Sequence, residues 1–237
     1  MDQGLRTQDG PGTKNEGPQD LLSPLHAIVD VDVAALARWA PLDLARSYLD
    51  GGARLLQLRA KHLPSGPFLD LCDALVQAAV PYRASIIVND RADLAALARA
   101  AGVHVGQEDL APADARGLLG PAAIVGFSTH TVAQIEAALR EPITYLAVGP
   151  VFGTNTKDTG YSAVGLELVS TAVRLAGDIP VVAIGGITLD TAPAVWGVGA
   201  AAVAVISDLV SSGDPAARVA SYNRAYARQR SSQGASQ

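Results

Sequence analysis

Two cations stand two positions apart in the segment QLRAK, where Arg59 and Lys61 follow Gln57 at the end of an apolar run. Alternate residues of a strand point to one side, so these three side chains share a face. Like charges on one face repel each other unless an anion lies between them. Arg59 offers a planar fork of donors and Lys61 a point charge, which together suit a diphosphate. A solvated strand end is the alternative if the motif is taken alone.

Two carboxylates follow the next two apolar runs, Asp90 after SIIVN and Asp109 after GVHVGQE. Each has a simple alternative role as the cap of a following helix, which would begin near Arg91 or Ala111. In neighbouring parallel strands, however, both carboxylates would lie at the same end, beside the cations. Mg²⁺ usually takes one or two carboxylates plus phosphate oxygens. The pair therefore predicts Mg²⁺ carried in with a phosphate ester.

The segment GPVFGTNTKDTGYSAVGLE, residues 149–167, places Thr154, Thr156 and Lys157 among small residues. It follows a run typical of a buried strand and precedes a helix expected from about Val164. So much donor capacity after a strand predicts a phosphate-binding loop, and its glycines make it a candidate lid.

A second phosphate position is predicted from Gly185-Gly186 and from Ile206-Ser207, which follow the last two apolar runs. Many barrels bind phosphate there through backbone N–H groups. A tight turn with Ser207 as a helix cap is the alternative. His104 lies inside a run and is expected to be packed or hydrogen-bonded, and the loop residue His130 is a weak signal.

Eight short apolar runs recur along the chain, separated by segments with helical spacing. Continuous apolar runs are typical of strands covered on both faces. Their repeated alternation with helices predicts a single-domain α/β protein, a (β/α)₈ TIM barrel, with an open doubly wound sheet as the alternative. The runs occupy residues 26–30, 53–59, 85–90, 102–107, 123–128, 145–150, 181–186 and 202–207.

Composition agrees with a globular domain. The chain has 237 residues, near the roughly 250 of one barrel. We expect disordered tails over residues 1–20 and 229–237, with the barrel over 21–228. A net charge of −5 argues against nucleic-acid binding, and no apolar run reaches the roughly 18 residues of a membrane helix. One cysteine, Cys72, and the absence of an apolar leader favour the cytoplasm.

Seven motifs, read in order, resemble the signature of the thiamine-phosphate synthases. They are QLRAK, NDRADLA, GVHVGQEDL, GFSTH, GPVFGTNTK, AIGGI and VISD. The resemblance implies a (β/α)₈ barrel that condenses 4-amino-2-methyl-5-(diphosphooxymethyl)pyrimidine with a plain or carboxylated thiazole phosphate. Thiamine phosphate and diphosphate would be the products. Ala60 departs from the pattern, where the family often carries glutamate.

The resemblance also implies residue roles. Asp90 and Asp109 would hold Mg²⁺, and Ser128 would contact the pyrimidine ring. The residues expected to act in catalysis are Arg59, Lys61, Ser128 and Lys157. Those expected to bind the two substrates are Gln57, Leu58, Arg59, Ala60, Lys61, Asn89, Ser128, Thr154, Asn155, Thr156, Lys157, Gly186, Ile206 and Ser207.

Three alternative functions were weighed on these residues. A thiazole tautomerase of the same fold should lack the full Mg²⁺ and diphosphate set. A phosphosugar isomerase or epimerase needs an acid–base pair at carbon that does not stand out here. A noncatalytic binder of thiamine phosphates would have little reason to keep both carboxylates and three cations. The partners expected are small molecules, neither nucleic acid nor membrane, and a homodimer is one option for the assembly.

Overall fold

The computed structural model describes residues 23–153 and 161–234. Its eight strands are parallel and close into a barrel in chain order, with β1 paired to both β2 and β8. The (β/α)₈ prediction is confirmed, and every predicted apolar run overlaps one strand. The strands are β1 Leu25–Asp30, β2 Leu55–Arg59, β3 Ser85–Asn89, β4 Gly102–Val105, β5 Ile124–Thr129, β6 Tyr145–Val148, β7 Val181–Ile184 and β8 Ala202–Val205.

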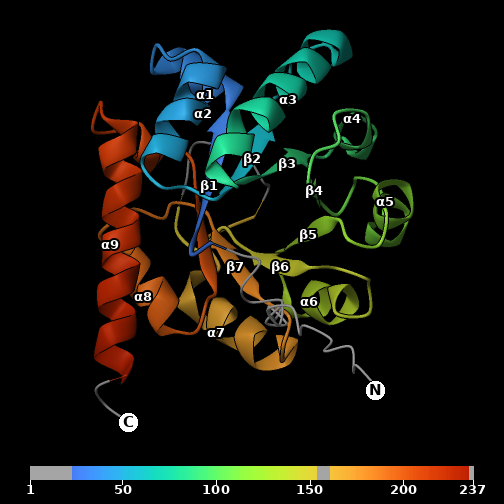
Figure 1. The fold of residues 1–237 in the computed structure, drawn as a ribbon. Helices are drawn as coiled ribbons and strands as arrows, with labels where there is room; N and C mark the ends of the chain where they lie inside the picture. Colours follow the sequence, from blue (N-terminus) through green and yellow to red (C-terminus); the bar gives the residue numbers. More distant parts are fainter. Residues whose placement is uncertain (1–22, 154–160, 235–237) are drawn as a thin grey trace, which may run out of the picture.

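Helices surround the strands on the outside of the barrel (Figure 1). The α-helices are α1 Val31–Leu36, α2 Pro41–Asp50, α3 Ser65–Ala79, α4 Ala92–Leu97, α5 Pro112–Leu119, α6 Val132–Ala138, α7 Gly165–Ala176, α8 Ala192–Gly197 and α9 Pro215–Gly234. Two short 3₁₀ turns, η1 Val80–Tyr82 and η2 Ser207–Leu209, complete the described elements.

Strand residues alternate between two cores because successive side chains point to opposite faces. In β1 the residues Leu25, Ala27 and Val29 pack outward against the helices, whereas Ile28 faces the barrel interior. The interior core is smaller and joins Ile28 to Leu55, Ile87, Ile124, Tyr145, Ala147, Val182, Ala202 and Ala204. Both faces of the strands are buried, which explains why the runs are continuously apolar.

A tyrosine fills the barrel interior opposite a glycine. The ring of Tyr145 is fully buried, and a Cβ built on Gly126 would lie 2.0 Å from its Cζ atom. Gly126 and Tyr145 are paired across β5 and β6. The absence of a side chain at Gly126 therefore makes room for a large aromatic ring inside a narrow barrel.

The C-terminal boundary differs from the prediction. Helix α9, red in Figure 1, continues to Gly234, so a disordered tail beginning at residue 229 is too long. This helix packs against α2 and α8. Its last two turns carry mostly polar residues, and the sequence there has no apolar period that would indicate a helix.

Candidate active site

A cavity of about 480 Å³ opens where the strands end. Its floor includes Ile28, Ile184 and Ala204, which belong to or pack against the interior core. Polar residues and glycines from the ends of β2, β3, β5, β7 and β8 form the walls. They include Gln57, Arg59, Asn89, Ser128, Gly185, Gly186, Ser207 and Asp208. An apolar floor with a small number of polar groups around it is typical of a small-molecule site.

Arg59 forms a buried ion pair on one wall of the cavity. It is the last residue of β2 and donates from Nη1 to the Asp30 carboxylate at the end of β1. Asp30 also accepts from the N–H groups of Asp32 at 3.1 Å and Val33 at 3.0 Å, so it caps α1. The Nε atom of Arg59 is buried and has no hydrogen-bond partner among the described residues. A buried donor without a partner is rare in a native protein, and a ligand oxygen or an ordered water would satisfy it.

Lys61, Asp90 and Asp109 form a second charged group at the same end of the barrel. The Nζ atom of Lys61 lies 2.7 Å from Oδ2 of Asp90. Asp90 has a left-handed backbone, with φ of 62°, and its N–H donates to the carbonyl of His104 at 2.8 Å. Asp109 accepts from the N–H of Gly106 at 2.8 Å.

The two carboxylates touch, and neither caps a helix. Helices α4 and α5 have no side-chain cap, so the capping alternative is wrong for both aspartates. Burial raises the pKa of the Asp109 carboxyl, the Gly106 N–H opposes the rise, and a hydrogen bond with Asp90 raises it further. Two adjoining carboxylates repel unless a proton or a cation lies between them.

This donor set fits Mg²⁺ when oxygens of a ligand or of water complete the coordination. The described residues hold no group of three or more His, Cys, Asp or Glu side chains arranged for a metal. The described residues therefore do not form a metal site in which protein side chains supply all the ligands. Two acidic side chains beside a lysine are the arrangement expected of a metal that arrives with a phosphate group.

A hydrogen-bonded row crosses the barrel interior below the cavity. His104 contacts Ser128 through Nε2 at 2.8 Å and Tyr145 through Nδ1 at 2.9 Å. Burial raises the pKa of Tyr145, so its hydroxyl stays protonated. The expectation that His104 is hydrogen-bonded is confirmed, and it also lines the cavity. The row fixes Ser128 where a ligand would meet it.

The opposite wall is formed by backbone after β7 and β8. Gly185 and Gly186 both have positive φ, 103° and 63°. A Cβ on Gly186 would lie 2.6 Å from the carbonyl oxygen of Gly153, and one on Gly185 would lie 2.5 Å from Pro150. Both positions therefore require glycine, because backbone and proline come too close for a side chain. Ile206 and Ser207 line the cavity beside them.

A family model described as thiamine monophosphate synthase matches residues 26–209, which include β2 to β8, all but the first residue of β1, and the cavity residues named above. The chain belongs to this family. The matched range begins in β1 and ends at the last residue of η2.

Individual relatives agree with the thiamine monophosphate synthase assignment. A thiamine-phosphate synthase of Anaeromyxobacter dehalogenans is 42% identical over 195 residues, which cover 82% of this chain and 87% of that protein. One of Roseiflexus castenholzii is 41% identical over 190 residues, or 80% and 82% of the two chains. The solved structure of a thiamine phosphate pyrophosphorylase from Pyrococcus furiosus has a TM-score of 0.80 and 29% identity, covering 89% of this chain and 98% of that chain.

Most of the described residues that the family resemblance pointed to gather at this end of the barrel. Seven line the cavity itself, namely Gln57, Arg59, Asn89, Ser128, Gly186, Ile206 and Ser207. The charged group beside the cavity consists of Lys61, Asp90 and Asp109, and Asp90 directly follows the last residue of β3. Asn89 and Asp90 are consecutive, which places the acidic pair at the edge of the cavity.

Two predicted substrate contacts have side chains on the other face of the strand. Leu58 and Ala60 are buried in the outer core, between the barrel and the helices. Alternation explains this, since their neighbours Gln57 and Arg59 face inward. The side chains of Leu58 and Ala60 do not line the cavity. Thr154, Asn155, Thr156 and Lys157 lie outside the described residues.

Several polar residues of the site were missed by the sequence analysis. Asp30 ends an apolar run and lies two residues after Ile28, so alternation along the strand turns both side chains to the same face. That spacing was the signal in the sequence that could have identified Asp30. Thr188 and Asp208 line the cavity beyond the predicted glycines and serine. His130, which the sequence marked only as a weak signal, also lines the cavity, with Nδ1 2.5 Å from the carbonyl of Gly149 and its ring stacked on Tyr161 at 4.0 Å.

Proposed function

We propose that the protein condenses 4-amino-2-methyl-5-(diphosphooxymethyl)pyrimidine with 4-methyl-5-(2-phosphooxyethyl)thiazole to thiamine phosphate and diphosphate. The carboxylated form of the thiazole would give the same two products and release its carboxyl group as CO₂. One observation carries the proposal. A single cavity joins Arg59 and Asn89 on one wall to Gly186 and Ser207 on another, with Ser128 between them. Such a cavity has a place for a diphosphate, a ring and a separate phosphate. Membership of the thiamine monophosphate synthase family supports the assignment.

The reaction breaks the bond between the ring-bound CH₂ and a diphosphate oxygen. The electron pair leaves with diphosphate, and the aminopyrimidine ring donates electron density to the CH₂ cation that remains. The thiazole nitrogen then attacks this carbon and forms the new C–N bond. Neutralising the leaving group matters more in such a step than a strong base does.

Arg59 and Lys61 are the described cations assigned to the diphosphate. Asp30 holds the Arg59 guanidinium from one side, so its buried Nε donor is fixed before the substrate arrives. Preorganised donors of this kind stabilise developing charge because they need no rearrangement during the reaction. Lys157, beyond the described residues, is proposed as a third cation at the same group.

Asp90 and Asp109 are proposed to hold Mg²⁺. When bound there, the metal would neutralise part of the negative charge that develops on diphosphate. Lys61 keeps Asp90 in place and shares its charge. A cation between the Asp90 and Asp109 carboxylates would relieve the repulsion between them.

Ser128 is proposed to orient the pyrimidine ring. Its hydroxyl is held by His104, which Tyr145 holds in turn. Fixing the ring and the thiazole phosphate in one cavity places the thiazole nitrogen next to the carbon it attacks. The apolar floor of Ile28, Ile184 and Ala204 keeps water from the cation.

The test is turnover with both substrates in the presence of Mg²⁺. The synthase should form thiamine phosphate and diphosphate in equal amounts, and a chelator should abolish both. A thiazole tautomerase would convert the thiazole carboxylate without any pyrimidine substrate and release no diphosphate. A noncatalytic binder would bind the substrates and form no product. Either of the last two results would overturn the proposal.

Further assignments remain proposals of ours. The described residues contain no helix long and apolar enough to cross a membrane. We propose a cytoplasmic location on the grounds of the single cysteine, Cys72, which is buried and free. Small-molecule partners follow from the reaction, and the acidic net charge of −5 argues against nucleic acid. A homodimer is the assembly to test by light scattering.

A further inference from the structure

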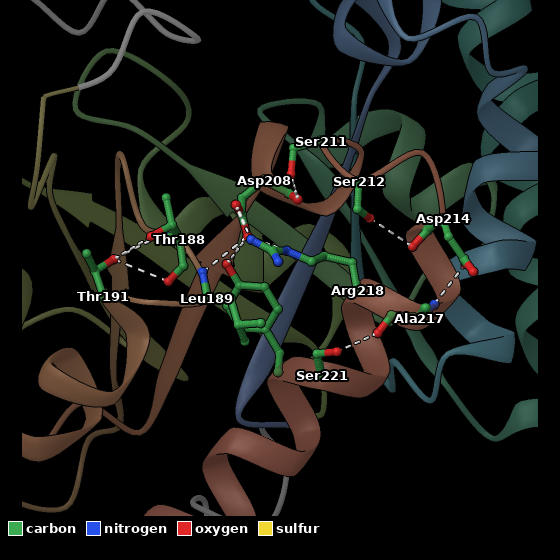
Figure 2. A network of polar contacts seen from close by, with 11 residues as sticks. Thr188, Leu189, Thr191, Asp208, Ser211, Ser212, Asp214, Ala217, Arg218 and Ser221 are labelled. Atoms are coloured by element: carbon green, nitrogen blue, oxygen red, sulfur yellow. Dashed lines mark hydrogen bonds and ion pairs between the residues drawn. The ribbon is translucent and has the colours of Figure 1, made fainter.

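One carboxylate beyond the predicted phosphate position receives four hydrogen bonds. Asp208 Oδ1 accepts from Arg218 Nη2 at 2.7 Å, and Oδ2 accepts from Arg218 Nε at 3.0 Å. The Tyr222 hydroxyl donates to Oδ2 at 2.6 Å, and the N–H of Leu189 donates to it at 3.2 Å. Figure 2 shows Arg218 and Leu189 directed toward Asp208. The guanidinium fork makes this a strong, orientation-specific contact.

The four bonds connect three parts of the chain. Asp208 lies in η2, directly after Ser207, and both line the cavity. Leu189 belongs to the segment between β7 and α8 that also contains Gly186 and the cavity residue Thr188. Arg218 and Tyr222 lie in the first turns of α9. The carboxylate therefore connects the segments that follow β7 and β8, which form the wall proposed to bind phosphate, to α9.

Short-range bonds stiffen the same segments. The hydroxyl of Ser211 donates to the carbonyl of Asp208 at 2.8 Å, and Asp214 accepts from the N–H of Ala217 at 3.0 Å, where α9 begins. On the other segment, the N–H of Thr188 donates to Thr191 Oγ1 at 2.9 Å. These contacts are drawn in Figure 2. Together with the bonds to Asp208, these contacts restrict movement of the backbone after β7 and β8.

The negative charge of Asp208 also has to be neutralised. Its side chain is only 10% exposed and lines the cavity in which a phosphate is proposed to bind. An unpaired carboxylate there would oppose a phosphate group by like-charge repulsion. The hydrogen bond to Asp208 raises the pKa of Arg218, so the guanidinium stays charged. Burial and Asp208 raise the pKa of Tyr222, so its phenol remains a donor.

We propose that Arg218 and Tyr222 are positioning residues for the second substrate's phosphate. They act through Asp208, by neutralising its carboxylate and by fixing the two backbone segments that meet the phosphate. Neither residue is among those that line the cavity in the described part of the chain. The inference rests on the proposed function for the identity of that substrate, the thiazole phosphate.

The first experiment compares Arg218→Met with the wild type in steady-state kinetics for each substrate. We expect the KM for thiazole phosphate to rise about tenfold or more, as for the loss of a charge-assisted contact. The KM for the pyrimidine diphosphate and kcat at saturation should change less than about twofold, because the bond that breaks lies at the other wall. Arg224→Met is the matched control, since Arg224 is exposed on the same helix and contacts Ser221.

The second experiment separates charge neutralisation from a purely structural role. The double variant Arg218→Met/Asp208→Asn lacks the unpaired negative charge at residue 208, so the KM for thiazole phosphate should recover at least about threefold relative to Arg218→Met. If Arg218 only anchors α9, removing its partner would give no recovery. Should Arg218→Met fail to fold, Tyr222→Phe removes one donor without a change of volume and should raise the same KM about threefold to tenfold.

Two results would overturn the inference: equal rises in both KM values, or unchanged kinetics in Arg218→Met and Tyr222→Phe. A direct binding measurement tests the positioning role of Arg218 separately from the proposed synthase activity. Inorganic phosphate should raise the thermal midpoint of the wild type and of Arg224→Met, and this rise should be smaller in Arg218→Met. If the wild type formed no thiamine phosphate, the proposed function would fail, while a phosphate-dependent rise lost in Arg218→Met would still support the positioning role. An equal rise in all three proteins would contradict it.

Discussion

Asp30 and Arg59 are the last residues of neighbouring strands, and the guanidinium of one donates to the buried carboxylate of the other. The side chain of Asp30 is 1% exposed and that of Arg59 is 12% exposed. Neither the apolar run that ends at Asp30 nor the motif QLRAK shows this contact. Parallel pairing of β1 with β2 creates it, because the register sets Asp30 opposite Arg59.

Replacing Asp30 with alanine should unfold the protein more easily. The change leaves the Arg59 charge buried without its partner and removes the cap of α1, so we expect a loss of about 3 to 5 kcal/mol in the free energy of unfolding. Urea denaturation measures it. Asp43→Ala is the control, because the Asp43–Arg46 pair is exposed and should contribute less than about 1 kcal/mol. Equal losses in the two variants would contradict the buried pair.

Stability should fall in weak acid because of His26. Burial, helped by the charge of His104, lowers the pKa of His26 to about 3. In the unfolded chain the ring titrates near its ordinary value of 6.5, so protonation favours unfolding at every pH below that value. The stabilising contribution is complete above about pH 6.5 and is lost progressively as the pH falls towards 3.

His26→Leu removes this dependence. The free energy of unfolding of the wild type, relative to the variant, should fall by about 2 kcal/mol between pH 7 and pH 5. Denaturant titrations at both pH values measure the difference. His62→Gln serves as a control, since the His62 side chain is 84% exposed, and its stability should follow the wild type at both values. A constant difference between wild type and His26→Leu would show that His26 is not buried as a neutral ring.

Gly126→Ala should disturb the barrel interior. The new methyl group would lie 2.0 Å from the Tyr145 ring, which is fully buried and has little room to move. We expect a loss of about 1 to 3 kcal/mol from overpacking, measured by chemical denaturation. Gly117→Ala is the matched control, because nothing lies within 4 Å of its Cβ position in α5 and alanine favours a helix by about 0.5 to 1 kcal/mol. The same sign of change at both glycines would argue against a close contact in the barrel.

Asp90→Asn and Asp109→Asn should each alter the metal requirement. Each variant removes one of the two proposed Mg²⁺ ligands, so the Mg²⁺ concentration for half-maximal rate should rise about tenfold or more. Rates at several Mg²⁺ concentrations measure it. Asp114→Asn, on the exposed side of α5, controls for a general loss of negative charge. If the Mg²⁺ dependence of both variants matched the wild type, these aspartates would not belong to the metal site.

The strands and their order could be read from the sequence because both faces of each strand are buried. A continuous apolar run such as SIIVN, residues 85–89, needs no knowledge of its partners to be recognised. The polar residue at the end of each run also follows locally, which is why Asn89 and Ser128 were found. Leu58 and Ala60 were assigned to the substrates with their neighbours, although alternation turns their side chains outward.

Contacts across the barrel could not be predicted in the same way. His104 contacts Ser128 and Tyr145 from three consecutive strands, β4, β5 and β6, and the contacts depend on the pairing register and on all three side chains pointing into the barrel. Asp208 meets Arg218 and Tyr222 because α9 folds back against α2 and α8 after β8. The polar end of that helix carries no apolar stripe, so its length was underestimated as well.

The central claim is that one cavity holds both phosphorylated substrates with their reacting atoms side by side. A crystal structure with Mg²⁺, thiazole phosphate and a nonreactive analogue of the pyrimidine diphosphate tests it most directly. The account predicts the diphosphate at Arg59, Lys61 and the Asp90–Asp109 pair, the ring at Ser128, and the thiazole phosphate at Gly186 and Ser207. Binding of either molecule outside this cavity, or of both phosphate groups at one wall, would contradict it.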